Sequence, residues 1–75
     1  NPKAGVYIFK DRIVCIGRFY NQTIYKKDIE SIEFKGILWG FEIKKKNSKK
    51  NDYIMVMTKD LSQQISTLCN YLGMQ

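Results

Sequence analysis

The sequence predicts an α+β fold that is mainly β, in which an antiparallel sheet or partly open barrel of about six strands is closed by one C-terminal amphipathic helix. Two observations carry this prediction. Short apolar runs separated by turn residues recur at intervals of about 8–12 residues, which is typical of a sandwich or small barrel. The only segment with a clear helical period, residues 58–73, follows all of these runs.

The terminal helix has a start signal and a stop signal. We expect Asp60 to be its N-cap, because a carboxylate there accepts a hydrogen bond from a free backbone N–H of the first turn. Gln63, three residues later, completes a capping-box-like pair, and Thr58 is an alternative N-cap. Gly73 stands where a left-handed residue ends many helices.

One stripe of this helix is apolar and is predicted to cover the end of the barrel, next to Ile43, Met55 and Met57. The stripe consists of Leu61, Ile65, Leu68, Cys69 and Leu72. Gln64 and Thr67 fall away from the stripe, so we expect this flank to form one wall of a groove for a partner.

The N-terminal part predicts a hairpin and a short third strand. Residues 5–10 and 12–17 are apolar runs around a tight turn at Asp11-Arg12. Both faces of this hairpin are apolar, which is typical of a covered sheet. A loop or continued strand follows, with a turn at Asn21-Gln22, and residues 23–26 form the third strand.

The next strand, residues 29–35, requires a bulge near Glu30-Ser31 to bring Ile29 and Ile32 to one face. Residues 36–40 form a turn bracketed by glycines. Residues 41–46 then predict a half-exposed strand with Phe41 and Ile43 facing inward.

The last strand, residues 52–57, follows a polar loop at residues 47–51. It is the most apolar of the strands, and we therefore expect it to be central. Met55 and Met57 within it are interpreted as residues that fill the core.

The 75 residues are expected to form a single domain with a net charge of +6. This charge favours anionic partners such as phosphorylated headgroups, anionic lipid or nucleic acid. No apolar run approaches the roughly 20 residues that span a bilayer, and no signal peptide pattern is visible. We expect a cytoplasmic location, with the inner face of the membrane as one possibility.

The residue types argue against catalysis and against a cofactor. The chain has no histidine, which is the commonest general base and a frequent metal ligand. Asp28, Glu30 and Glu33 are close in sequence, and a solvated strand edge is favoured over a paired-carboxylate site. Cys15 and Cys69 are interpreted as buried free thiols, with a disulfide as the alternative and no zinc site expected.

A cluster of lysines around one predicted hairpin turn is the first candidate binding site. It consists of Lys44, Lys45, Lys46, Lys49 and Lys50. Such a tip attracts an anionic membrane surface, whereas the alternative is a solvated loop that discourages edge pairing. Both interpretations stay open.

Aromatic side chains give two further candidates. Trp39, with Leu38, is either an exposed anchor for a partner or a plug for one end of the barrel, and the plug is favoured. A second group lies beside Lys10 and Arg18, where a base-stacking platform is weighed against core or interface packing, and packing is favoured. This group consists of Tyr7, Phe9, Phe19 and Tyr20.

Two stretches resemble known domains. The sequence GVYIFKDRIVCIG is similar to the first hairpin of bacterial pleckstrin-homology-like (PH-like) and GRAM-type domains. TIYKKDIESIEF is similar to a segment in which these domains enter the next strand. The pattern falls on Ile24, Asp28, Ile29, Ser31, Ile32 and Phe34. The third lobe of FERM domains has a similar layout, including a terminal helix with a pair like Leu68-Cys69.

The resemblance covers roughly residues 5–72 and implies a PH-like fold without enzymatic activity. PH-like barrels have seven strands, whereas six are counted here. A further N-terminal strand, a split of residues 18–26, or a second chain would supply the seventh. The phosphoinositide-binding loop of the family is reduced here to Lys10-Asp11-Arg12.

The resulting expectation is a non-enzymatic module that binds a protein or peptide partner or associates with itself. In a PH-like fold a peptide can add as a strand between the helix and a neighbouring strand edge. Binding to an anionic membrane or phosphoinositide through residues 44–50 is the alternative, and nucleic-acid binding is a second alternative.

Overall fold

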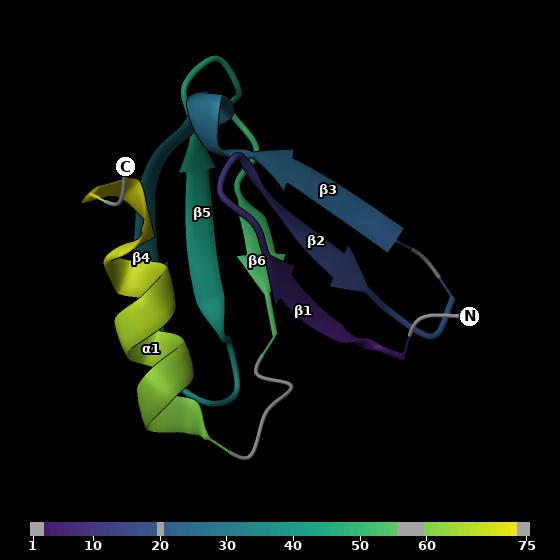
Figure 1. Ribbon diagram of the computed structural model, residues 1–75. Coiled ribbons are helices and arrows are strands. Elements are labelled where there is room, and N and C mark those ends of the chain that lie inside the picture. Colours follow the sequence, from purple (N-terminus) through teal and green to yellow (C-terminus); the bar gives the residue numbers. More distant parts are fainter. Residues whose placement is uncertain (1–2, 20, 56–59, 74–75) are drawn as a thin grey trace.

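The computed structural model describes residues 3–19, 21–55 and 60–73, which form a mainly β structure with one C-terminal α-helix (Figure 1). The first three-stranded antiparallel sheet contains β1 (Gly5–Ile8), β2 (Arg12–Ile16) and β3 (Asn21–Tyr25). The second contains β4 (Ile29–Phe34), β5 (Phe41–Lys45) and β6 (Asp52–Ile54). The helical elements are the 3-10 turn η1 (Lys26–Asp28), the helix α1 (Leu61–Cys69) and the 3-10 turn η2 (Tyr71–Gly73).

The α+β class, the antiparallel strands and the terminal helix are confirmed, but the strands do not form one sheet or a closed barrel. Within the described residues, hydrogen bonding orders the strands as β1-β2-β3 and β4-β5-β6. The physical reason is η1, which turns the chain between β3 and β4 so that β4 begins a second sheet.

The first hairpin is confirmed, and its turn and its third strand differ slightly from the prediction. Phe9 N donates to Arg12 O at 2.8 Å, so the loop is Lys10-Asp11. The turn expected at Asn21-Gln22 is wrong, because Asn21 already pairs with Ile16 as the first residue of β3.

The second sheet confirms the predicted bulge. The pairing of β4 with β5 shifts between Ile29 and Ser31, and Ile29 is buried. Phe41 and Ile43 are buried as expected. The expectation that the last strand is central is wrong, because β6 pairs only with β5 and forms an edge of its sheet.

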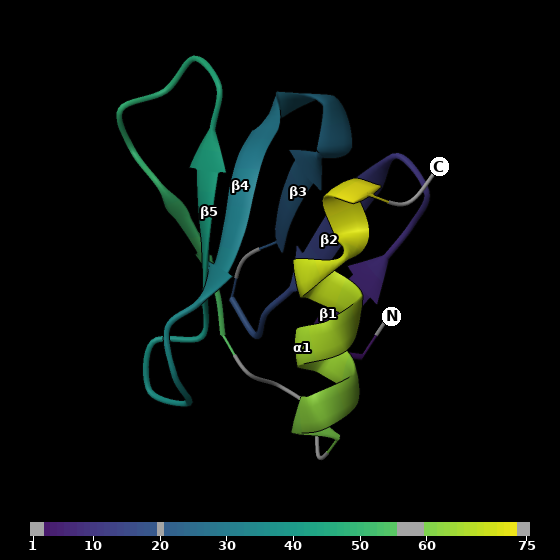
Figure 2. The same ribbon diagram turned by 90° about the vertical axis from the view of Figure 1, so that its left-hand side faces the viewer.

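The core lies between the two sheets and α1. Its buried side chains are Ile13, Cys15, Ile24, Ile29, Phe41, Ile43, Ile54, Leu68 and Tyr71. Met55 is 44% exposed, so its predicted core role is wrong, and Met57 lies outside the described residues. The helix packs against β4 along the side of the molecule between the sheets (Figure 2).

The helix start is confirmed and its end is not. Asp60 Oδ1 accepts a hydrogen bond from Gln63 N at 3.0 Å, whereas Thr58 lies outside the described residues. The helix ends at Cys69, with Asn70 as its C-cap, and Gly73 does not adopt the left-handed conformation.

The earlier end of the helix changes which side chains reach the core. Leu68 is buried, and Leu61 and Ile65 are half-buried. Cys69 and Leu72 are exposed, so their predicted burial is wrong. Tyr71 is buried in their place, because the turn η2 redirects the chain after α1.

Candidate binding surfaces

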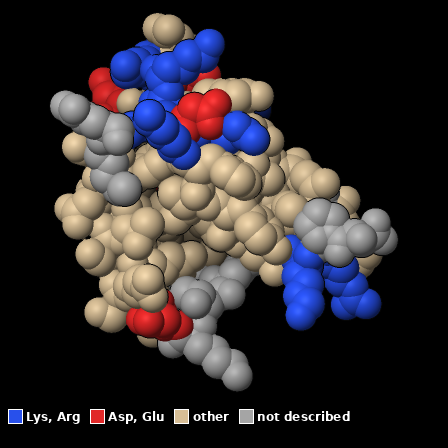
Figure 3. Space-filling view, in the orientation of Figure 1, with Lys and Arg blue, Asp and Glu red and all other residues tan. Residues whose placement is uncertain are grey.

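Basic residues from three separate segments gather at one end of the molecule. Lys26 N donates to Asp11 O at 2.9 Å, and Lys46 N donates to Asp28 O at 2.9 Å. These two backbone bonds join the β1–β2 turn, η1 and the β5–β6 loop. Figure 3 shows lysines and arginines concentrated there. We call this surface the basic end; its cations are Lys10, Arg12, Lys26, Lys27, Lys45, Lys46, Lys49 and Lys50.

The predicted lysine cluster is only part of this surface. Lys45, Lys46, Lys49 and Lys50 belong to it, but Lys44 does not. Lys44 is exposed on β5 opposite Ser31, and it does not line either hollow of the basic end. The contributions of the β1–β2 turn and of η1 were missed, because only the tertiary structure brings these turns beside the β5–β6 loop.

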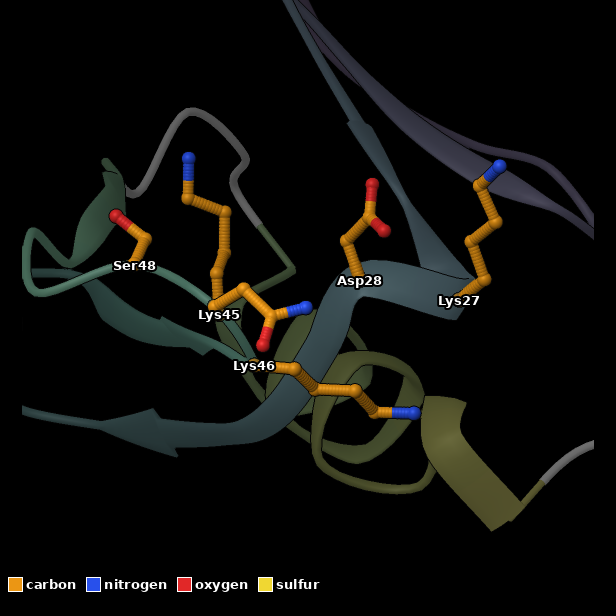
Figure 4. Close-up of a pocket in the computed structure, with 6 residues that line it drawn as sticks. Lys27, Asp28, Lys45, Lys46 and Ser48 are labelled. Atoms are coloured by element: carbon orange, nitrogen blue, oxygen red, sulfur yellow. The ribbon is translucent and has the colours of Figure 1, made fainter.

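Two hollows open on the basic end, on either side of Lys27. The first, of about 240 Å³, lies between η1 and the β5–β6 loop; it is lined by Lys27, Asp28, Lys45, Lys46, Asn47 and Ser48 (Figure 4). The second, of about 630 Å³, is lined by Lys10, Asp11, Tyr25, Lys26 and Lys27.

Acidic side chains neutralise this surface only in part. Lys45 Nζ lies 3.0 Å from Asp52 Oδ2, and Arg12 pairs with Asp11 at 2.9 Å. Among the described residues, the basic-end cations without an ion pair are Lys10, Lys27, Lys46, Lys49 and Lys50. The basic end therefore keeps an excess of positive charge.

The C-terminal segment fixes the basic end from inside. Tyr71 Oη donates to Phe9 O at 2.6 Å, and Lys26 Nζ lies 4.9 Å from the centre of the Tyr71 ring. Burial raises the pKa of Tyr71, and the charge of Asp11 adds to this effect. This tyrosine therefore links η2 to the β1–β2 turn and to η1.

The β4–β5 loop, residues 35–40, presents apolar side chains to solvent at the opposite end of the molecule (Figures 1 and 2). Ile37, Leu38 and Trp39 are 66%, 81% and 69% exposed. The prediction that Trp39 plugs the barrel is wrong. Gly36 and Gly40, at φ 99° and 70°, hold the loop in a conformation that directs these side chains outward.

Gln64 and Thr67, the expected wall of a partner groove, do line a hollow. It has a volume of about 180 Å³ and separates α1 from β1. Its lining residues are Val6, Ile8, Asp60, Gln63, Gln64 and Thr67. Leu38 and Trp39 do not line this hollow, so it unites only two of the four residues predicted to bind a partner.

The remaining candidates are not brought together. Phe9 lies at the turn of the β1–β2 hairpin, beneath Arg12 at 4.7 Å, whereas Phe19 follows the other end of β2. No single aromatic platform therefore forms from these two residues, and Tyr20 lies outside the described residues. Tyr7 and Phe9 are exposed and do not pack in the core, so of the favoured core or interface packing only the interface part stays a prediction for them.

The candidate carboxylates Asp28 and Glu33 lie at separate places on the molecule. Asp28 lines a hollow of the basic end, whereas Glu33 pairs with Lys35 at 3.3 Å near the other end of β4. Both cysteines are free: Cys15 is buried as predicted, and burial raises its pKa. Within the described ranges, no three His, Cys, Asp or Glu side chains are grouped as for a metal ion.

Comparisons with protein families, with curated proteins and with solved structures return no match to this chain. In residues 3–19, 21–55 and 60–73, no helix is long and apolar enough to cross a membrane.

Proposed function

We propose that this chain is a non-enzymatic binding module whose basic end attaches to phosphorylated headgroups at an anionic membrane surface. The observation that carries the proposal is the convergence of cations from the β1–β2 turn, η1 and the β5–β6 loop. Six antiparallel strands followed by a terminal helix also support placing the chain among PH-like modules. A cytoplasmic location at the inner face of the membrane follows from the same proposal.

The distribution of charge favours a membrane over a nucleic acid. The cations occupy one end of the molecule, where a flat anionic surface can meet them together. All but Arg12 are lysines, which bind phosphate as compact point charges, whereas arginine is preferred for planar bidentate contacts. Each lysine near an anionic leaflet contributes about 1 kcal/mol, so the exposed cations together suffice for salt-sensitive attachment.

Vesicle co-sedimentation tests this proposal. Binding is expected to rise with the fraction of anionic lipid and to fall with salt, because the surface potential is screened within about 8–10 Å at 0.1–0.15 M. Lys27→Gln with Lys46→Gln is expected to weaken binding about tenfold or more, by the loss of two surface lysines. Lys3→Gln with Arg18→Gln removes the same charge outside the basic end and is the matched control. Equal loss of binding in both double variants would refute a site at the basic end.

Trp39, the single tryptophan of the chain, reports which end meets the membrane. Trp39 belongs to the β4–β5 loop, which lies at the end opposite the basic end, so the fluorescence emission of Trp39 is expected to stay unchanged when vesicles bind. A blue shift would show that the apolar loop inserts instead and would overturn the proposed orientation.

Binding of a protein segment is the second candidate function. It is favoured by the hollow between β1 and α1, where the side chains of Gln64 and Thr67 face a strand at the edge of its sheet. Strand addition at such an edge supplies main-chain hydrogen bonds, and the adjacent hollow supplies room for side chains. An edge strand that accepts a segment would show slower amide exchange at β1 once the segment is bound.

A further inference from the structure

The hollow between η1 and the β5–β6 loop contains a carboxylate among its lysines. Lys27, Lys45 and Lys46 line it, and Asp28 is the acidic member of the same lining. In the view of Figure 4 the Asp28 carboxylate lies between the side chains of Lys45 and Lys27. An acid in this place opposes a ligand that is only anionic, because like charges repel.

The charged side chains of this hollow do not neutralise one another. Lys45 Nζ pairs with Asp52 Oδ2 at 3.0 Å, so this lysine is neutralised by an acid that is not part of the lining. Within the described ranges, Lys27, Lys46 and Asp28 have no ion pair. The hollow therefore offers two unpaired cations and one unpaired anion to a ligand.

The main chain holds these three groups at one place. Lys46 N donates to Asp28 O at 2.9 Å, which joins the residue of one cation to the residue of the anion. Lys27 precedes Asp28 in the single turn of η1. The two lysine ammonium groups are carried on flexible four-carbon stems and can adjust to a ligand, whereas the shorter Asp28 side chain stays close to the main chain.

We propose that this hollow binds the phosphoserine headgroup of phosphatidylserine at the membrane surface. This inference rests on the proposed function and names the lipid. The headgroup carries a phosphate, a carboxylate and an ammonium, which are two anions and one cation, the reverse of the unpaired charges in the hollow. Lys27 and Lys46 bind the two anionic groups, and the Asp28 carboxylate accepts charge-assisted hydrogen bonds from the ammonium.

The size of the hollow also suits a headgroup. Its volume of about 240 Å³ lies below the range of about 300–1,000 Å³ that is typical of pockets for drug-sized ligands, so it fits a smaller ligand. Asn47 and Ser48 complete the lining with polar side chains. Lys10, Lys49 and Lys50 lie outside this hollow and stay available to neighbouring anionic lipids.

Vesicles that contain equal fractions of either phosphatidylserine or phosphatidylglycerol test the proposal, because both lipids carry one net negative charge. Co-sedimentation is expected to show about fivefold stronger binding to phosphatidylserine, the factor that one favourable exposed ion pair supplies. Equal or weaker binding to phosphatidylserine would overturn this inference and would leave attachment of the basic end to anionic lipid intact. Absence of binding to both compositions would overturn the proposed function as well.

Asp28→Asn separates recognition of the headgroup from the effect of surface charge. This variant is expected to bind phosphatidylglycerol more tightly, because a repelling carboxylate is removed, and to lose the preference for phosphatidylserine. Asp11→Asn neutralises a carboxylate of the second hollow and is the matched control, which is expected to strengthen binding to both lipids and to keep the preference. Both variants retain the main-chain carbonyls that accept hydrogen bonds from Lys46 N and Lys26 N. A preference that survives in Asp28→Asn would overturn the inference.

Discussion

The two loops at the ends of β5 have opposite chemistry, and both project into solvent. The β4–β5 loop carries Ile37, Leu38 and Trp39, whereas the β5–β6 loop carries Lys46, Lys49 and Lys50. Composition alone would bury the first loop and expose the second. The difference teaches that apolar character does not decide burial in a short loop; the backbone conformation that the loop must adopt decides it.

The backbone of the β4–β5 loop is closed by its own hydrogen bonds. Gly40 N donates to Gly36 O at 2.7 Å, and Lys35 N donates to Gly40 O at 2.8 Å. The loop backbone is therefore closed by bonds among its own residues. The β5–β6 loop differs, because Lys46 at its start bonds to η1 and a hollow forms beside that junction.

The largest expected effect is the difference in unfolding free energy between a variant in the core and a variant in the neighbouring apolar loop. Phe41 is fully buried and its ring lies 5.1 Å from that of Phe34, so Phe41→Ala is expected to cost about 3–5 kcal/mol of unfolding free energy. Trp39→Ala, only two positions away, is expected to cost less than about 0.5 kcal/mol. Urea unfolding followed by far-UV circular dichroism measures both; a comparable loss in the two variants would place Trp39 in the core.

A smaller effect tests how the apolar loop is held. A Cβ at Gly40 would overlap the carbonyl oxygen of Ile54, in addition to the cost of a positive φ. A Cβ at Gly36 meets nothing within 4 Å, so only the conformational cost remains there. Gly36→Ala is expected to cost about 1 kcal/mol, and Gly40→Ala about 2–3 kcal/mol or more. The reverse order of the two midpoints in urea would contradict this account of the loop.

The smallest expected effect concerns the anchor of the basic end. Tyr71→Phe removes the hydrogen bond to Phe9 O and is expected to cost about 1 kcal/mol at neutral pH. Because burial raises the pKa of Tyr71 in the folded chain, its contribution is present below the unfolded value near pH 10 and is lost as the pH rises through the folded value.

The stability difference between the natural chain and Tyr71→Phe should therefore shrink above about pH 10. Unfolding midpoints measured from pH 7 to pH 11 give this difference directly, and the variant itself controls for the titration of the other tyrosines. A stability difference that stays constant from pH 7 to pH 11 would mean that the contribution of Tyr71 to stability does not depend on the protonation of its hydroxyl.

Much of the local structure could be predicted because it depends on neighbouring residues. The cap at Asp60 needs only Gln63, and the bulge beside Glu30 needs only the spacing of Ile29 and Ile32. The helix end was harder, because the Tyr71 ring and its hydroxyl are fixed by Phe9 and Lys26, which are far away in the sequence. In the sequence, the apolar stripe of the helix continues regularly through Cys69 and Leu72, so its pattern does not indicate that the helix ends at Cys69.

The candidate surfaces divide in the same way. The lysines of the β5–β6 loop are adjacent in sequence and could be named from it, but Lys10, Lys26 and Lys27 join them only through the backbone bonds at Asp11 and Asp28. The sequence by itself determined the fold class, the strand and helix order, the helix cap and the bulge, since short-range hydrogen bonding and side-chain periodicity specify them. Only the tertiary structure decided that there are two sheets, that Trp39 is exposed and that three turns form one basic end, because these features depend on contacts between segments whose spacing in the chain carries no local signal.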